Sequence, residues 1–133
     1  LRPDVAATPE GLHHITMFLG GRWYGLTPKA GTFAPADPIG GLDVSILQSN
    51  LLAPVLGIGD PRTDTRIDFV GGIRGTGELE RRCAADAAVA FALHPVQVGQ
   101  LMAIADAGAI MPPKSTWFEP KLRSGLVVRS LKQ

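Results

Sequence analysis

The chain has little of the chemistry that cross-links or anchors a small protein. Its 133 residues include one cysteine and no long apolar run. Cys83 cannot close an intrachain disulfide, so we expect a packed, inert thiol in a reduced, cytoplasmic protein. The longest apolar stretch, Ala84 to Leu93, contains Asp86 and is far shorter than the roughly 20 residues that span a bilayer. We therefore expect no membrane segment.

Complete metal-binding or catalytic sets are also missing from the sequence. His13 and His14 are neighbours on an expected strand, so their side chains would point to opposite faces and could not converge on one ion. His94 precedes Pro95, near the expected start of a helix. Packing at that helix start explains this histidine better than metal binding does. There is no Gly-x-Ser-x-Gly elbow and no pair of catalytic carboxylates. The sequence predicts no metal site and no catalysis by this segment alone.

The amino-acid composition is typical of a globular protein. Hydrophobic residues make up 45% of the chain and charged residues 19%, whereas a disordered chain would have fewer aliphatics and a larger net charge. Residues 1–12 lack periodicity and are expected to be a linker or a truncated start, and residues 13–133 a single domain. The start has neither an initiator Met nor a signal-peptide pattern, so we expect the C-terminal part of a longer protein.

A β-hairpin is predicted near the start of the domain. Apolar residues alternate from His13 to Leu19, and the pattern returns from Arg22 to Thr27. The intervening Gly20-Gly21 is typical of a two-residue turn with positive φ angles. This turn predicts a register in which Phe18 faces Trp23, Met17 faces Tyr24 and Ile15 faces Leu26.

Three helices and further strands are expected after the hairpin. Apolar residues recur at helical spacing from Asp43 to just before Pro54, and Asp43 is expected to cap the first turn of this helix. A second helix is expected from Thr76 to about Ala85. Pro95 is expected to begin a third helix, which buries Val98, Leu101, Met102 and Ala105 and ends at Gly108. Strands are predicted at residues 67–70, 87–93 and 125–131. The fold class is α+β, a mixed sheet with helices mainly on one face.

Charge is distributed unevenly along the chain. The net charge is +1, but residues 114–133 have five Lys or Arg against one acid, while residues 1–113 have eight against eleven. The closing segment therefore favours a small anionic ligand or partner. A nearly neutral chain makes nucleic acid an improbable partner, because nucleic-acid-binding domains present a broader basic surface.

The closing loop contains the main candidate for anion binding. An ammonium and two hydroxyls lie together, with more cations after them, and such groups suit phosphate or carboxylate. The candidates are Lys114, Ser115, Thr116, Lys121 and Arg123. A structural interpretation stays open: prolines stiffen the loop, Trp117 and Phe118 fill the core, and the hydroxyls bond loop backbone.

Two weaker anion-binding candidates precede this loop. Glycines lie between an expected strand and helix, where backbone amides can hold phosphate, but the spacing matches neither GxGxxG nor the P-loop. The second weaker candidate is the charged loop from Asp60 to Arg66. Ion pairs between the loop's own side chains explain its charges equally well. The residues concerned are Arg62, Asp68, Gly71, Gly72 and Arg74.

The second half of the chain resembles a known family. The segments that support this resemblance are residues 91–95 (FALHP), 101–108 (LMAIADAG), 111–121 (MPPKSTWFEPK) and 124–126 (SGL). They resemble the end of the ParB-like family called domain of unknown function 1015. The family's Gly-His-His-Arg element is absent, since His13-His14 is preceded by Leu12 and followed by Ile15.

The resemblance implies a structural or ligand-contacting domain that completes a larger ParB-like protein and contacts its upstream domain. Some distant relatives of the ParB fold use nucleotides, and a few phosphorylate free serine. An alternative is therefore that the anion-binding residues serve a nucleotide-dependent phosphotransferase site in the full-length protein, with no cofactor in this segment itself. A weaker alternative is a dimerisation or DNA-contacting module, and homo-oligomers are compatible with either.

Overall fold

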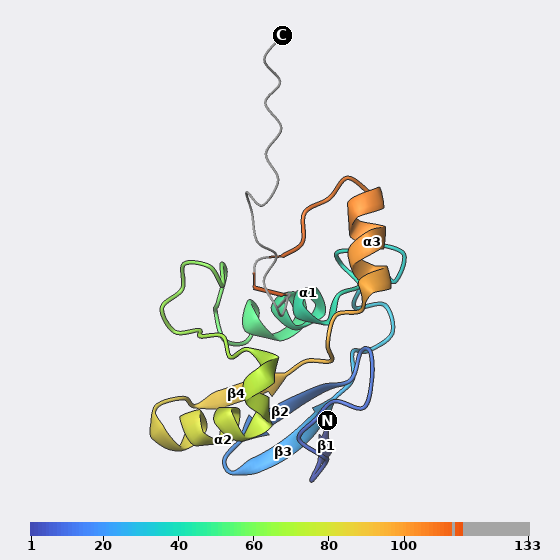
Figure 1. Ribbon diagram of the computed structural model, residues 1–133. Helices are drawn as coiled ribbons and strands as arrows, with labels where there is room; N and C mark the ends of the chain where they lie inside the picture. Colours follow the sequence, from blue (N-terminus) through green and yellow to red (C-terminus); the bar gives the residue numbers. More distant parts are fainter. Residues whose placement is uncertain (113, 116–133) are drawn as a thin grey trace.

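The computed structural model describes residues 1–112, 114 and 115, which include a four-stranded sheet and three α-helices (Figure 1). The sheet order is β1-β3-β2-β4. The strands are β1 (Arg2–Pro3), β2 (Ile15–Leu19), β3 (Arg22–Leu26) and β4 (Val89–Ala92). The predicted α+β class and N-terminal hairpin are confirmed. A mixture of strand directions was expected, but each pairing in the described sheet is antiparallel.

The hairpin has the register that its sequence predicts. Phe18 pairs with Trp23, Met17 with Tyr24 and Ile15 with Leu26. Gly20 and Gly21 have φ angles of +57° and +80°, which two-residue hairpin turns of this hand require and which glycine adopts without steric cost. The Phe18 and Trp23 rings pack with centroids 5.1 Å apart. The turn and the alternation of apolar residues thus fix the centre of the sheet.

The first twelve residues, expected as a linker, lie on the domain. Arg2 pairs with Gly25 at the edge of the sheet. The Thr16 hydroxyl donates a 2.5 Å hydrogen bond to the carbonyl of Ala7. A Cβ atom at Gly25 would approach a Val5 methyl to 3.3 Å, so the small residue lets the opening segment lie close over β3.

The first helix, α1 (Asp43–Leu47), continues into a wider π-type turn, η1 (Gln48–Leu52). Its buried residues Leu47 and Leu52 form a core cluster with Ile15 of β2 and Ile58. Successive strand residues point to opposite faces of a sheet, so η1 lies against the hairpin face that carries Ile15.

The second helix, α2 (Gly75–Ala85), follows the short 3₁₀ turn η2 (Gly72–Arg74) and lies against β2 and β4. The Trp23 indole donates a 2.7 Å hydrogen bond to Glu80 of α2, so this helix meets the other face of the hairpin. The strand predicted at residues 67–70 is wrong: these residues form loop. A short apolar run forms a strand only where a neighbouring strand can pair with it.

The third helix, α3 (Val98–Asp106), begins three residues after the predicted Pro95 start. Gln97 and Gln100 form a reciprocal capping box at its beginning, and Gly108, with φ +66°, follows its end as predicted. The predicted buried stripe is wrong. Val98 and Met102 are 72% and 59% exposed, and Ile104 is the buried residue. A helix that is apolar nearly all round does not reveal which side meets the core.

Candidate functional site

Two of the predicted anion-binding residues, Lys114 and Ser115, lie on a pocket between α1, the end of β4 and the start of α3. Its volume is about 110 Å³, and a single water needs only about 10–15 Å³ measured in this way. The lining combines apolar walls with a few polar side chains. Its residues are Leu12, Leu42, Asp43, Val44, Phe69, Leu93, His94, Val96, Gln100, Lys114 and Ser115.

Lys114 has an aromatic neighbour at the pocket. Its ammonium nitrogen lies 5.0 Å from the centroid of the Phe69 ring, a cation–π contact. The pKa of Asp68 is below its ordinary value because the Phe69 N–H and the Arg82 guanidinium bond the carboxylate, with a smaller contribution from the positive charge of Lys114. The φ angle of Lys114 is +58°, an uncommon value for a residue with a side chain.

Ser115 forms a hydrogen bond within the loop, which agrees with a structural role for this residue. Its hydroxyl donates a 2.5 Å hydrogen bond to the carbonyl of Pro112. The hydroxyl proton is therefore engaged, and the oxygen retains its capacity as an acceptor. Ser115 thus both stabilises the loop and lines the pocket.

Asp43 is the polar group of this pocket that the sequence analysis misinterpreted. It was expected to cap α1, but the helix has no side-chain cap. Instead, Asp43 Oδ1 accepts hydrogen bonds from the backbone N–H and from Nδ1 of His13, both at 3.0 Å. The carboxylate is 5% exposed. Its Oδ2 atom is buried and has no hydrogen-bond partner among the described residues.

His13 is the other partner in these hydrogen bonds. Its backbone has φ +62°, and its ring packs against Phe33 with centroids 4.8 Å apart. Because Nδ1 donates to the carboxylate, the neutral ring would keep its Nε2 lone pair free. A bond between residues thirty positions apart leaves no local pattern, so a sequence reading misses it.

The weaker candidates do not line this pocket, although Asp68 is adjacent to its lining residue Phe69. Arg62 forms a fork with Asp60, with an Nη2 to Oδ2 distance of 2.7 Å, and this hydrogen bond lowers the pKa of Asp60 to about 2. Asp68 pairs with Arg82. Gly71 and Gly72 lead into η2, whose Arg74 N–H donates to the Gly71 carbonyl at 3.0 Å. Mutual ion pairing and a tight turn account for these residues.

Several predictions concern residues outside those that the structure describes. They are the anion-binding candidates Thr116, Lys121 and Arg123, the core residues Trp117 and Phe118, and the strand at residues 125–131.

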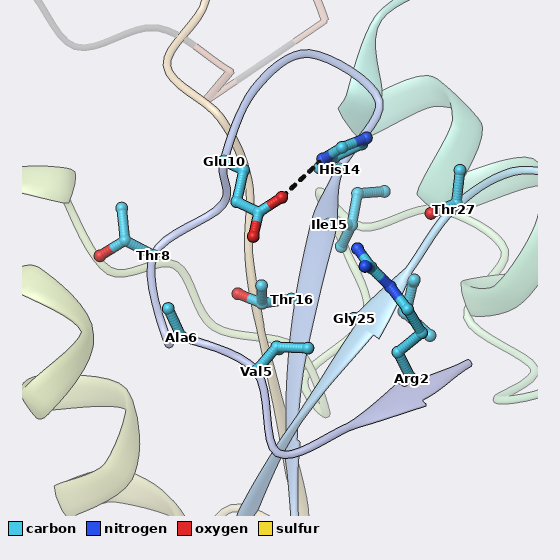
Figure 2. Close-up of a pocket in the computed structure, with 11 residues that line it drawn as sticks. Arg2, Val5, Ala6, Thr8, Glu10, His14, Ile15, Thr16, Gly25 and Thr27 are labelled. Atoms are coloured by element: carbon cyan, nitrogen blue, oxygen red, sulfur yellow. Dashed lines mark ion pairs between the residues drawn. The ribbon is translucent and has the colours of Figure 1, made fainter.

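A second, smaller hollow lies beside the opening segment, where His14 and Glu10 face each other (Figure 2). Its volume is about 20 Å³, room for about one water. His14 Nδ1 lies 3.6 Å from Glu10 Oε2, too long for a direct hydrogen bond. His13 and His14 have different carboxylate neighbours. The strand expected to separate them is not formed there, since β2 begins at Ile15 and His13 has φ +62°.

The described residues also bear on metal binding, membrane insertion and the reactivity of the thiol. Within residues 1–112, 114 and 115, no three or more His, Cys, Asp or Glu side chains gather as metal ligands do. In the same residues, none of the helices has the length and apolar character needed to cross a bilayer. Burial, and then the charge of Asp86, raise the pKa of the Cys83 thiol, which fits an unreactive cysteine.

Comparisons of the chain with family models, curated proteins and solved structures give no match. The fold and the pocket define an α+β domain with a small cavity whose mainly apolar lining includes a few polar side chains.

Proposed function

We propose that this chain is the C-terminal, ligand-contacting domain of a larger ParB-like protein of the family called domain of unknown function 1015, and that it binds a small anionic group through Lys114. The closing MPPKSTWFEPK segment supports the family. The observation that supports the ligand is that Lys114 and Ser115 line one pocket together with Asp43, His94 and Gln100.

The chemistry of this pocket suits part of a ligand. An ammonium at its edge attracts a phosphate or carboxylate, and the surrounding apolar residues lower the dielectric and strengthen that attraction. A volume of about 110 Å³ is less than the roughly 300–1,000 Å³ of pockets that enclose drug-sized ligands. The domain would hold the anionic end of the ligand, and the upstream domain would contact the remainder.

Lys114 is the residue to change in a test of this function. In the full-length protein, the Lys114→Ala variant should bind inorganic phosphate and ATP at least about tenfold more weakly than the unmodified protein, the loss expected for one charge-assisted contact. Isothermal titration calorimetry measures both affinities. Equal affinity of the variant and the unmodified protein would remove the basis for the proposal.

A matched control comes from the opposite end of the sheet. Arg22 is an exposed cation beside the hairpin turn, whereas the pocket is lined by Leu12, which precedes β2, and by Leu93, which follows β4. Arg22→Ala removes the same amount of charge and should leave the affinity for both ligands unchanged. If both variants lose affinity equally, the effect reflects net charge and not the pocket.

A further inference from the structure

The walls of the pocket around Lys114 are more apolar than an anion alone needs. Low polarity strengthens the attraction between Lys114 and an anion, yet aliphatic walls also remove water from an ion and offer it no donor in return. Four aliphatic side chains that keep some exposed surface line this pocket: Leu12, Val44, Leu93 and Val96. These walls suit an apolar part of the ligand.

The polar side chains of the pocket suit a single anionic group. Lys114 is exposed and can neutralise an anion. The Gln100 side-chain oxygen accepts from the Gln97 N–H, so its amide nitrogen remains as a donor. Asp43 also lines the pocket, but it is 5% exposed and presents little surface to a ligand. Lys114 and Gln100 thus give the pocket a cation and a neutral donor.

The volume of the pocket limits the size of the apolar part. About 110 Å³ holds roughly seven water-sized groups at about 15 Å³ each, and a methylene is of similar size to a water. A phosphate or carboxylate with a tail of a few carbons therefore fits, whereas a long acyl chain does not. A tail in this space also gains dispersion contacts that the walls lack when the space is empty.

We propose that the ligand of this pocket is an anion with a short aliphatic tail, whose anionic group contacts Lys114 and whose tail lies against the four aliphatic side chains. This inference rests on the proposed function, because it takes the anion site at Lys114 as given, and it names the class of ligand. The tail distinguishes such a ligand from inorganic phosphate, since burial of apolar surface adds to the affinity.

Two probes that differ only in the tail test the inference. Methyl phosphate and n-propyl phosphate have the same charged group. The unmodified full-length protein should bind n-propyl phosphate about tenfold more tightly in calorimetry, because each buried methylene raises the affinity about fourfold. The Lys114→Ala variant should bind both probes more weakly by the same factor, because it removes the contact to the phosphate and leaves the tail in place.

A variant of the apolar wall places the tail in this pocket. Val96→Thr replaces a methyl by a hydroxyl of similar size, so it should reduce the preference for n-propyl phosphate and leave the affinity for methyl phosphate unchanged. Val98→Thr is the matched control, because Val98 is 72% exposed and does not line the pocket. If circular dichroism shows that Val96→Thr does not fold, Val44→Thr makes the same test.

The outcomes separate the inference from the function on which it rests. Equal affinity of the unmodified protein for the two probes overturns the aliphatic tail, while weaker binding of both by Lys114→Ala keeps the anion site. Binding of neither probe overturns both. A preference for n-propyl phosphate that Val96→Thr and Val98→Thr retain equally means that the tail lies outside this pocket, which also overturns the inference.

Discussion

At the scale of single residues, Asp43 and Lys114 show what a sequence can and cannot predict. Lys114 was predicted from its place among hydroxyls and cations, and its environment at the pocket is compatible with anion binding. Asp43 was predicted for the wrong role because helix starts favour aspartate as a cap. Its actual partner, His13, is fixed by tertiary packing and is not visible in local sequence.

The bond between Asp43 and His13 should contribute measurably to stability. Asp43→Ala leaves the His13 N–H and Nδ1 without their acceptor, so the free energy of unfolding should fall by about 1–3 kcal/mol. Asp43→Asn should cost less, since the amide oxygen can still accept. Urea denaturation followed by circular dichroism measures both changes.

Asp106→Ala serves as the control for these variants, since Asp106 is exposed and its side chain has no hydrogen-bond partner within the described part of the chain. If Asp43→Ala lowers the free energy of unfolding by no more than Asp106→Ala does, the hydrogen bonds to His13 contribute nothing to stability.

At the scale of elements, predictions succeeded where local chemistry dominates. Gly20-Gly21 and the alternating apolar residues specify the hairpin and its register without help from the rest of the chain. The α3 helix was placed only approximately. Its apolar residues surround the helix, so the side that buries Ile104 depends on elements distant in sequence.

The α2 helix should show a pH-dependent stability of its own. Side-chain hydrogen bonds from Arg81 and then Arg82 lower the pKa of Glu78 from 4.5 to about 2. Because the folded-state pKa is depressed, this contribution is fully present above pH 4.5 and is lost as the pH falls towards 2. Glu78→Gln should therefore lower the melting temperature at pH 7 and have progressively less effect below pH 4.5.

Thermal unfolding at low ionic strength across this pH range makes the comparison, since surface ion pairs are screened by salt. Asp106→Asn is again a suitable control, because Asp106 forms no ion pair among the residues that the structure describes. A Glu78→Gln effect that is constant from pH 7 to pH 2 would mean that its ion pairs do not stabilise α2.

At the scale of the whole molecule, the pocket is assembled from five separate parts of the chain. Its lining includes Leu12 before the hairpin, Asp43 at the start of α1, Phe69 in the loop before α2, Leu93 after β4, and Lys114 in the closing loop. Lys114 is an anion-binding candidate from sequence because it stands in a distinctive motif, and that role stays a prediction. The sequence could not reveal the wall opposite, because that wall exists only once the sheet and α1 have packed around Ile15 and Leu47.

We propose that this pocket, and not the charged loops elsewhere, is where the domain binds an anion. A titration of the ¹⁵N-labelled protein with inorganic phosphate, followed by amide chemical shifts, tests this proposal most directly. We expect the shifts to concentrate on Val44, His94, Gln100 and Ser115 and to saturate together. Shifts that centre on Arg62 or on Gly71 to Arg74, with the pocket amides unmoved, would contradict it.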